Sequence, residues 1–110
     1  MNIELKNQKC QACSGNTPRF DEKQITKYLS NLDNWSVNDE KQMIYKKFIF
    51  KTFKQALNFT NKVGELSDLE GHHPDISLGW GYSLVMIHTH AIKGLSINDF
   101  ILAAKIDALE

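Results

Sequence analysis

Residues 68–99 read DLEGHHPDISLGWGYSLVMIHTHAIKGLSIND, and this stretch decides the fold. Gly71 is the residue type expected just after a helix, because glycine readily adopts the left-handed conformation that ends one. Pro74, three residues later, also prevents a helix from continuing. Ser96 with Asp99 three positions on is a capping pattern that begins another helix. One helix is therefore predicted to end in this stretch and another to begin there.

A β-hairpin is predicted between these two helices. Residues 76–78 and 83–90 are apolar runs of strand length, and the glycine-containing segment 79–81 between them is typical of a turn. Side chains alternate between the two faces of a strand. One face of the second strand should carry Leu84, Met86, His88 and His90, and the other Val85, Ile87 and Thr89. Because a hairpin returns to its starting point, His90 should lie close to residues 72–73.

The rest of the chain completes an α+β pattern. Apolar residues recur at helical spacing in two upstream segments, with two strand-like runs between them. The predicted elements are helix 21–32, strands 35–37 and 43–50, helix 53–69, strands 76–78 and 83–90, and helix 96–110. They predict a single α+β domain of order αββαββα, whose four-stranded antiparallel sheet is covered by three helices on one side. Residues 1–18 are predicted to form an irregular N-terminal arm, and residues 19–110 the domain.

The far end of strand 43–50 is apolar on both faces. Phe48 and Phe50 share one face, and Ile49 lies on the other. A strand that is apolar on both faces is either covered on both sides or lies at a subunit interface. We therefore expect this protein to form oligomers.

The composition argues against several classes of protein. The chain has 110 residues and a formal net charge of zero, which argues against nucleic-acid binding through a general basic field. It has no run of 18 apolar residues that would predict a membrane span. Residues 1–9 lack the apolar core of a signal peptide. We expect a cytoplasmic protein with neither membrane attachment nor direct nucleic-acid binding.

Cys10 and Cys13 form the only cysteine pair, in the pattern Cys-x-x-Cys. The favoured interpretation is a loose, reduced N-terminal tail. A redox pair or half of a zinc site is the alternative. A thioredoxin-like motif should begin a helix after a strand, whereas a polar, turn-rich segment follows here.

All four histidines of the chain, His72, His73, His88 and His90, fall within residues 68–99. Histidine exchanges protons near neutral pH, so the capacity for proton transfer is concentrated in one place. Three imidazoles in one cleft can act as a proton donor, a proton acceptor and a substrate holder. His72, His73 and His90 are the three expected to converge.

Other roles are open for the same residues. His72 could cap the preceding helix through its dipole, and His73 and His90 could be ordinary surface or core histidines. Three histidines could also bind zinc, although the doublet lacks the spacing of a helical zinc motif. Asp99 could serve only the helix cap. Asp68 lies near the end of its helix, where a carboxylate is disfavoured, which suggests that it orients a histidine. The tryptophans, Trp35 and Trp80, are expected as core or rim aromatics, with a platform for a flat ring as the alternative.

The order and spacing of Asp68, His72-His73-Pro74, Trp80, His90 and Asp99 resemble the signature of the pterin-4a-carbinolamine dehydratases. The similarity extends to Thr17-Pro18, Leu32…Trp35, Phe48-x-Phe50, Thr89-His90 and Gly94-Leu95-Ser96, and so covers about residues 17–110. His88 stands where a small polar residue is expected.

The resemblance implies an activity. Members of this family dehydrate 4a-hydroxytetrahydropterin to quinonoid dihydropterin, which regenerates the pterin used by aromatic amino acid hydroxylases. They use neither a metal nor an organic cofactor. By similarity, His72, His73 and His90 are the catalytic residues, with His72 and His90 flanking the 4a-hydroxyl group. The substrate-binding residues implied are Gly71, His72, His73, His88, Thr89 and His90, supported by Asp68, Pro74 and Asp99.

The resemblance also implies partners. Besides the small-molecule pterin, it implies a homodimer or homotetramer and a functional link to an aromatic amino acid hydroxylase. Some relatives act instead as non-enzymatic assembly proteins or as dimerisation cofactors of a transcription factor. That role is the alternative, and the intact histidine set favours the enzyme.

Overall fold

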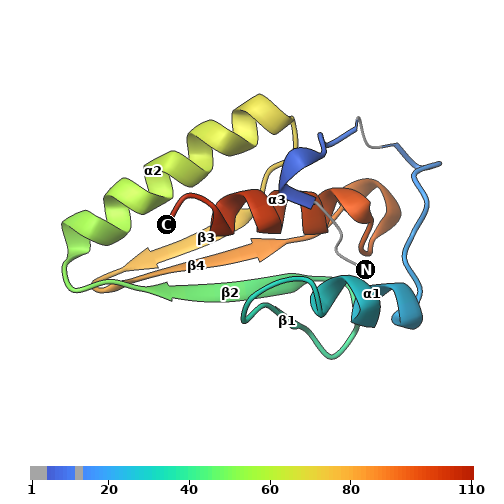
Figure 1. Cartoon of the computed structure of the whole chain (residues 1–110), viewed down its shortest axis with the longest axis horizontal. Coiled ribbons are helices and arrows are strands. Elements are labelled where there is room, and N and C mark those ends of the chain that lie inside the picture. The colour runs from blue at the N-terminus through green and yellow to red at the C-terminus, as the bar shows by residue number, and fades with distance from the viewer. Residues whose placement is uncertain (1–4, 12–13) are drawn as a thin grey trace.

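The four strands form one antiparallel sheet in the order β1-β2-β4-β3 (Figure 1). The computed structural model describes residues 5–11 and 14–110. Its main elements are α1 (Glu22–Leu29), β1 (Ser36–Val37), β2 (Ile44–Ile49), α2 (Phe53–Glu70), β3 (Asp75–Gly79), β4 (Tyr82–Ile87) and α3 (Ile97–Asp107). The predicted order αββαββα and the α+β class are confirmed.

One face of the sheet packs against the helices and forms the core. Ile44 and Phe48 of β2 pair with Ile87 and Ser83 of β4, and all four are buried. α2 and α3 lie over this face in Figure 1. α1 joins the same layer, because Tyr28 packs against Phe100 of α3 with 5.7 Å between ring centroids.

The opposite face of the sheet carries apolar side chains that the helices do not cover. Tyr45 and Ile49 of β2 point to this side, and Ile49 is 69% exposed. This arrangement matches the expectation that Phe48 and Ile49 lie on different faces. Folding buries only one face of the sheet, so the other is available to solvent or a partner.

The helix boundaries follow local chemistry. α1 begins with a reciprocal cap between Asp21 and Gln24, and α2 ends at Gly71, which has a φ of 67°. α1 stops at Leu29 and does not reach residue 32 as predicted. There the side chains of Ser30 and Asn31 donate to the carbonyl of Lys27, at 2.6 and 3.0 Å. Such side-chain bonds compete with the helical backbone pattern.

β4 ends at Ile87, so the prediction of a strand through His90 is wrong. The Thr89 side chain turns into the core and donates to Asp99, and its backbone forms an isolated bridge with Gly94. Residues His90–Ile92 form a 3₁₀ turn. The strand thus ends where its neighbours begin, since Ile87 pairs with the first residue of β2 and Met86 with the first residue of β3.

The N-terminal arm is docked against the domain. Leu5 is buried, and the backbone N–H of Cys10 donates to Glu70 at 3.0 Å. Gln11 and Asn98 exchange two hydrogen bonds of 2.9 and 2.8 Å. The expectation of a loose tail is therefore wrong for Cys10, which is buried and carries a free thiol. Cys13 lies outside the described residues.

In the part of the chain that the structure describes, no helix has both the length and the apolar character needed to cross a bilayer.

Candidate active site

His72 is held by a buried carboxylate. It follows Gly71, the residue that ends α2, and its Nε2 lies 2.7 Å from Oδ1 of Asp99 in the first turn of α3. His72 is 7% exposed, and Asp99 is completely buried. Because a carboxylate accepts the bond, Nε2 carries the hydrogen in this contact.

Asp99 bonds both His72 and the start of α3. Its second oxygen, Oδ2, accepts from the Thr89 hydroxyl at 2.8 Å and from the Ser96 backbone N–H at 2.9 Å. The Ser96 contact caps α3, as the sequence pattern predicted. The His72 contact uses the other oxygen, so the capping role and the supporting role are compatible.

His73 pairs with Asp68 at the surface. Its Nε2 lies 2.9 Å from Oδ1 of Asp68, and both side chains are largely exposed. Asp68 sits in the last turn of α2, five residues before His73. The contact gives Asp68 the orienting position that its unfavourable place in the helix suggested.

His88 and His90 lie together on the facing segment after β4. Their ring centroids are 4.0 Å apart. His88 Nε2 also lies 3.4 Å from the carboxylate of Asp75 at the start of β3. His90 is exposed at the beginning of the 3₁₀ turn His90–Ile92, which follows β4.

A pocket of about 340 Å³ brings these segments together. It is lined by Gly71, His72, His73, Pro74, Asp75, His88, Thr89, His90 and Ala91. All of the predicted catalytic and substrate-binding residues are in this set. Asp68 and Asp99 stand behind it, each bonded to one of the lining histidines. The Thr89 side chain is turned away to Asp99 and is buried.

Asp75 and Ala91 also line the pocket and were not predicted as site residues. For Asp75 the sequence did contain a signal. It directly follows the His-His-Pro triplet and directly precedes the predicted strand 76–78; in the structure it is the first residue of β3 and pairs with Met86 of β4. Ala91 has no side-chain chemistry to detect, and only the 3₁₀ turn brings it to the pocket.

Behind the site, a charged cluster ties the end of α2 to α3 and the arm. Lys105 bonds Glu70 at 2.8 Å. Burial alone would raise the pKa of Glu70, but hydrogen bonds from Lys105 and from the Cys10 backbone lower it below its usual value. Burial, reinforced by the Glu70 charge, raises the pKa of the Cys10 thiol to about 12. These contacts hold Glu70 in place, and Glu70 directly precedes Gly71 and His72.

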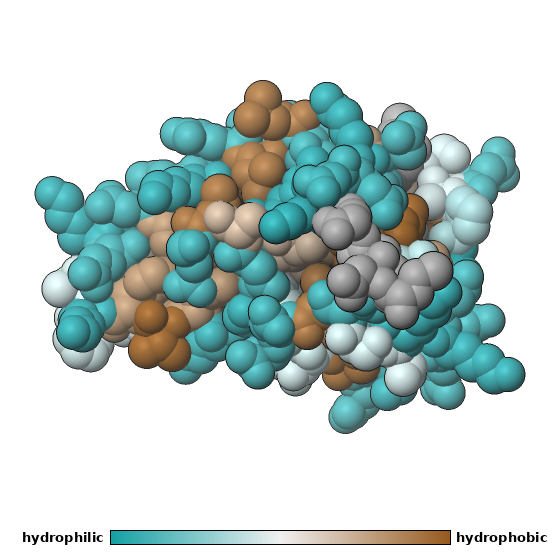
Figure 2. Space-filling view, viewed as in Figure 1, coloured by the Kyte–Doolittle hydropathy of each residue, from teal (hydrophilic) through white to brown (hydrophobic). Residues whose placement is uncertain are grey.

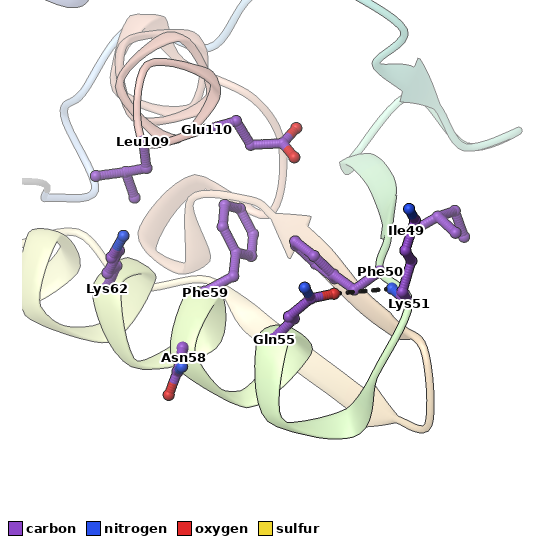
Figure 3. Close-up of a pocket in the computed structure, with 9 residues that line it drawn as sticks. All are labelled: Ile49, Phe50, Lys51, Gln55, Asn58, Phe59, Lys62, Leu109 and Glu110. Carbon is purple, nitrogen blue, oxygen red and sulfur yellow. Dashed lines mark hydrogen bonds between the residues drawn. The ribbon is translucent and has the colours of Figure 1, made fainter.

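A larger pocket, of about 520 Å³, lies at the opposite end of the sheet (Figure 3). Phe50 and Phe59 form its apolar wall, with ring centroids 5.3 Å apart, and Leu109 and Glu110 lie above them. Figure 2 shows apolar side chains near the start of α2, within a mainly hydrophilic face. None of the residues that line this pocket is a histidine, so it lacks the groups for proton transfer near neutral pH.

The tryptophans do not line the histidine pocket. Trp35 is buried and donates from its indole to Asp107, at 3.1 and 3.2 Å. Trp80 is 75% exposed on the turn between β3 and β4. Within residues 5–11 and 14–110, no three His, Cys, Asp or Glu side chains are grouped as a metal site.

Comparison with known proteins gives one consistent family. The family model described as pterin 4 alpha carbinolamine dehydratase matches residues 18–109. A Halorhodospira halophila protein is 46% identical over 107 residues, covering 97% of this chain and 98% of its own. A Rickettsia bellii protein is 48% identical over 107 residues, covering 96% and 94%. Both are provisionally named pterin-4-alpha-carbinolamine dehydratases.

Two solved structures share the fold. A transcriptional coactivator/pterin dehydratase from Brucella melitensis has a TM-score of 0.79 at 27% identity, covering 84% of this chain and 98% of its own. A pterin dehydratase-like RuBisCO assembly factor of the alpha-carboxysome has a TM-score of 0.61 at 26% identity, covering 70% and 89%. With the model match over residues 18–109, these findings show that the chain belongs to the pterin-4a-carbinolamine dehydratase family.

Proposed function

We propose that this protein dehydrates 4a-hydroxytetrahydropterin to quinonoid dihydropterin at a catalytic site of His72, His73 and His90, in which His72 and His90 are the acid–base groups. One observation carries the proposal: a carboxylate-held His72 lines the same pocket as His73 and His90. Family membership supports the substrate class. Other chemistries are less suited, because histidine side chains dominate the polar lining of the pocket.

The reaction requires two proton movements. The 4a-hydroxyl group leaves C4a as water after taking up a proton, and N5 loses its proton as the C4a–N5 double bond forms. His72 is suited to one of these transfers, because it lines the pocket and its ring is held in one orientation by Asp99. His90, on the facing wall of the pocket, is suited to the other. Such catalysis typically contributes about 10²–10⁴-fold to the rate.

His73 is assigned to holding the substrate. Its ring is directed by Asp68 and lies beside His72 at the edge of the pocket. A ring that is fixed by a surface carboxylate can donate to or polarise the pterin without entering the core. Backbone groups at Gly71–His73 and His88–His90 are proposed to bond the polar edge of the pterin.

The direct test follows the decay of 4a-hydroxytetrahydropterin at a pH where its spontaneous dehydration is slow. The protein is expected to accelerate the decay in proportion to its concentration. The His72→Gln variant at equal concentration is the matched control, since it distinguishes the site from general catalysis by surface imidazoles. Equal rates with and without the wild-type protein would defeat the enzyme proposal.

The alternative is a non-enzymatic assembly or coactivator role, because solved structures with this fold are named for such roles. The exposed apolar outer face of the sheet, including Tyr45 and Ile49, supports an interface with another chain. We propose that it contributes to a homodimer or homotetramer. Sedimentation of Ile49→Lys against wild type tests this, and an unchanged mass would argue against that face.

A link to an aromatic amino acid hydroxylase follows from the reaction. The 4a-hydroxypterin substrate arises when such an enzyme oxidises its tetrahydropterin. A coupled assay would test the link: adding this protein to a hydroxylase should reduce the accumulation of the 4a-hydroxypterin.

A further inference from the structure

A second hollow adjoins the histidine pocket. It has a volume of about 260 Å³ and is lined by Gln42, His88, His90 and Lys93. We call it the Lys93 pocket. His88 and His90 line both hollows, so their two rings separate the Lys93 pocket from the histidine pocket. A ligand that reaches past these rings can occupy both.

Lys93 occupies a backbone position that favours glycine. Its φ is 49° and its ψ is 47°, at the end of the 3₁₀ turn His90–Ile92. The position is held by the hydrogen bond from its N–H to the carbonyl of His90, at 3.2 Å, and by the bridge between Thr89 and Gly94. A long side chain at a strained backbone position is a reason to look for a function of that side chain.

The ammonium group of Lys93 is available to a ligand. Among the residues that the structure describes, it takes part in no ion pair. Gln42, on the loop between β1 and β2, adds an amide that can both donate and accept. The backbone N–H of Gln42 is bonded to Asn38 at 2.9 Å, which fixes this side of the pocket. Together they offer donors suited to hydroxyl, phosphate or other oxygen groups.

The chemistry of the substrate says what would reach these donors. In a pterin, C6 is bonded to N5, and N5 is bonded to the reacting C4a. If C4a lies between His72 and His90 as proposed above, the C6 substituent leaves the ring close to that reacting centre. The Lys93 pocket is the adjoining polar space, and it begins at His90 itself.

We propose that the Lys93 pocket binds the C6 side chain of the pterin, and that Lys93 and Gln42 make the enzyme prefer an oxygen-rich side chain to a plain alkyl group. This inference rests on the proposed function, because it takes the orientation of the pterin from the roles of His72 and His90. It adds a determinant of substrate specificity to the histidine site.

The test compares two substrates in matched variants. The substrates are the 4a-hydroxy forms of tetrahydrobiopterin, which carries a dihydroxypropyl group at C6, and of 6-methyltetrahydropterin. The readout is the ratio of their kcat/KM values. Lys93→Met removes the charge at similar length and is expected to lower the preference for the biopterin form by about fivefold to tenfold. Lys93→Arg should retain most of it, and Lys23→Met on α1 is the remote control.

Two results would overturn the proposal. In one, Lys93→Met changes kcat/KM for both substrates by the same factor, so that the ratio stays at the wild-type value. The second result comes from a binding experiment, which is used if the wild-type protein accelerates neither substrate and the proposed function is thereby defeated. Calorimetric binding of biopterin and 6-methylpterin, both stable, then decides the matter: equal affinity for the two would overturn the proposal, and a preference abolished by Lys93→Met would support it.

Discussion

His72 and Asp99 are joined by a 2.7 Å hydrogen bond between two helix ends that are 27 residues apart. Gly71 ends α2 and presents His72, and Ser96 begins α3 and presents Asp99. The same carboxylate also caps α3 and accepts from Thr89. The proposed acid–base residue is therefore positioned by the contacts that define where the two helices stop and start.

Asp99→Asn is expected to damage both the fold and the site. The amide keeps the size of the side chain but cannot accept from His72, Thr89 and Ser96 with two carboxylate oxygens. We expect the free energy of unfolding to fall by about 2–3 kcal/mol, because buried donors lose a charged acceptor. Misorientation of His72 should lower kcat by about 10²-fold. Urea unfolding and the dehydration assay measure the two effects.

Asp68→Asn is the control for that prediction. Asp68 also bonds a histidine, but it is exposed, so its loss should cost no more than about 1 kcal/mol. If Asp99→Asn loses stability yet keeps the wild-type kcat and pH–rate profile, Asp99 has only a structural role.

His90→Ala and His88→Ala separate two rings that touch each other. Both remove an imidazole from the same wall of the pocket, but only His90 has a proposed role in proton transfer. The His90 variant should lose about 10²-fold or more in kcat, and the His88 variant less than tenfold. Steady-state dehydration rates provide the comparison. Full activity in the His90 variant would refute the acid–base scheme.

Much of the site could be predicted because the relevant signals are local. Gly71 and Pro74 mark a helix end, Ser96 with Asp99 marks a helix start, and the intervening hairpin is short. Short connections leave few ways to arrange these pieces, so the histidines had to meet at one end of the sheet. The sheet face that each strand buries followed from alternation in the same way.

The features that were missed depend on contacts between distant segments. β4 ends at Ile87, which pairs with the first residue of β2, and Thr89 beyond it bonds Asp99. No periodicity in the strand shows either partner. The arm docks because Cys10 and Gln11 find partners on α2 and α3, 60 and 87 residues away. Local propensity predicts that a polar, turn-rich segment is irregular. It does not predict which distant residues that segment contacts.

Glu70 is expected to make the free energy of unfolding depend on pH. Hydrogen bonds from Lys105 and the Cys10 backbone outweigh burial and hold its pKa below the ordinary value of 4.5. The Glu70 carboxylate therefore binds a proton more readily in the unfolded chain than in the folded protein. The stabilisation is present above about pH 4.5 and is lost as the pH falls through the lower pKa of the folded state.

Glu70→Gln tests this contribution. At pH 7 the variant should be less stable than wild type by about 1–2 kcal/mol, because a charged acceptor is lost. Below pH 4 the difference should shrink. Unfolding free energies from urea titrations across this range give the comparison, and a difference that stays constant with pH would contradict the assigned pKa direction.

Cys10 is predicted to resist thiol reagents in the folded protein. Its thiol is buried beside the Glu70 carboxylate, and its pKa is raised to about 12. At pH 8 only a fraction on the order of 10⁻⁴ would be thiolate, the reactive form. In a Cys13→Ser background, labelling with an aromatic disulfide reagent should be slow in buffer and fast in urea, where Cys10 regains ordinary reactivity.

Glu70→Gln should speed native labelling, because it removes a neighbouring negative charge and loosens the docked arm. Complete labelling of the native protein within seconds would show that the arm does not hold Cys10 against α2 and α3 in solution.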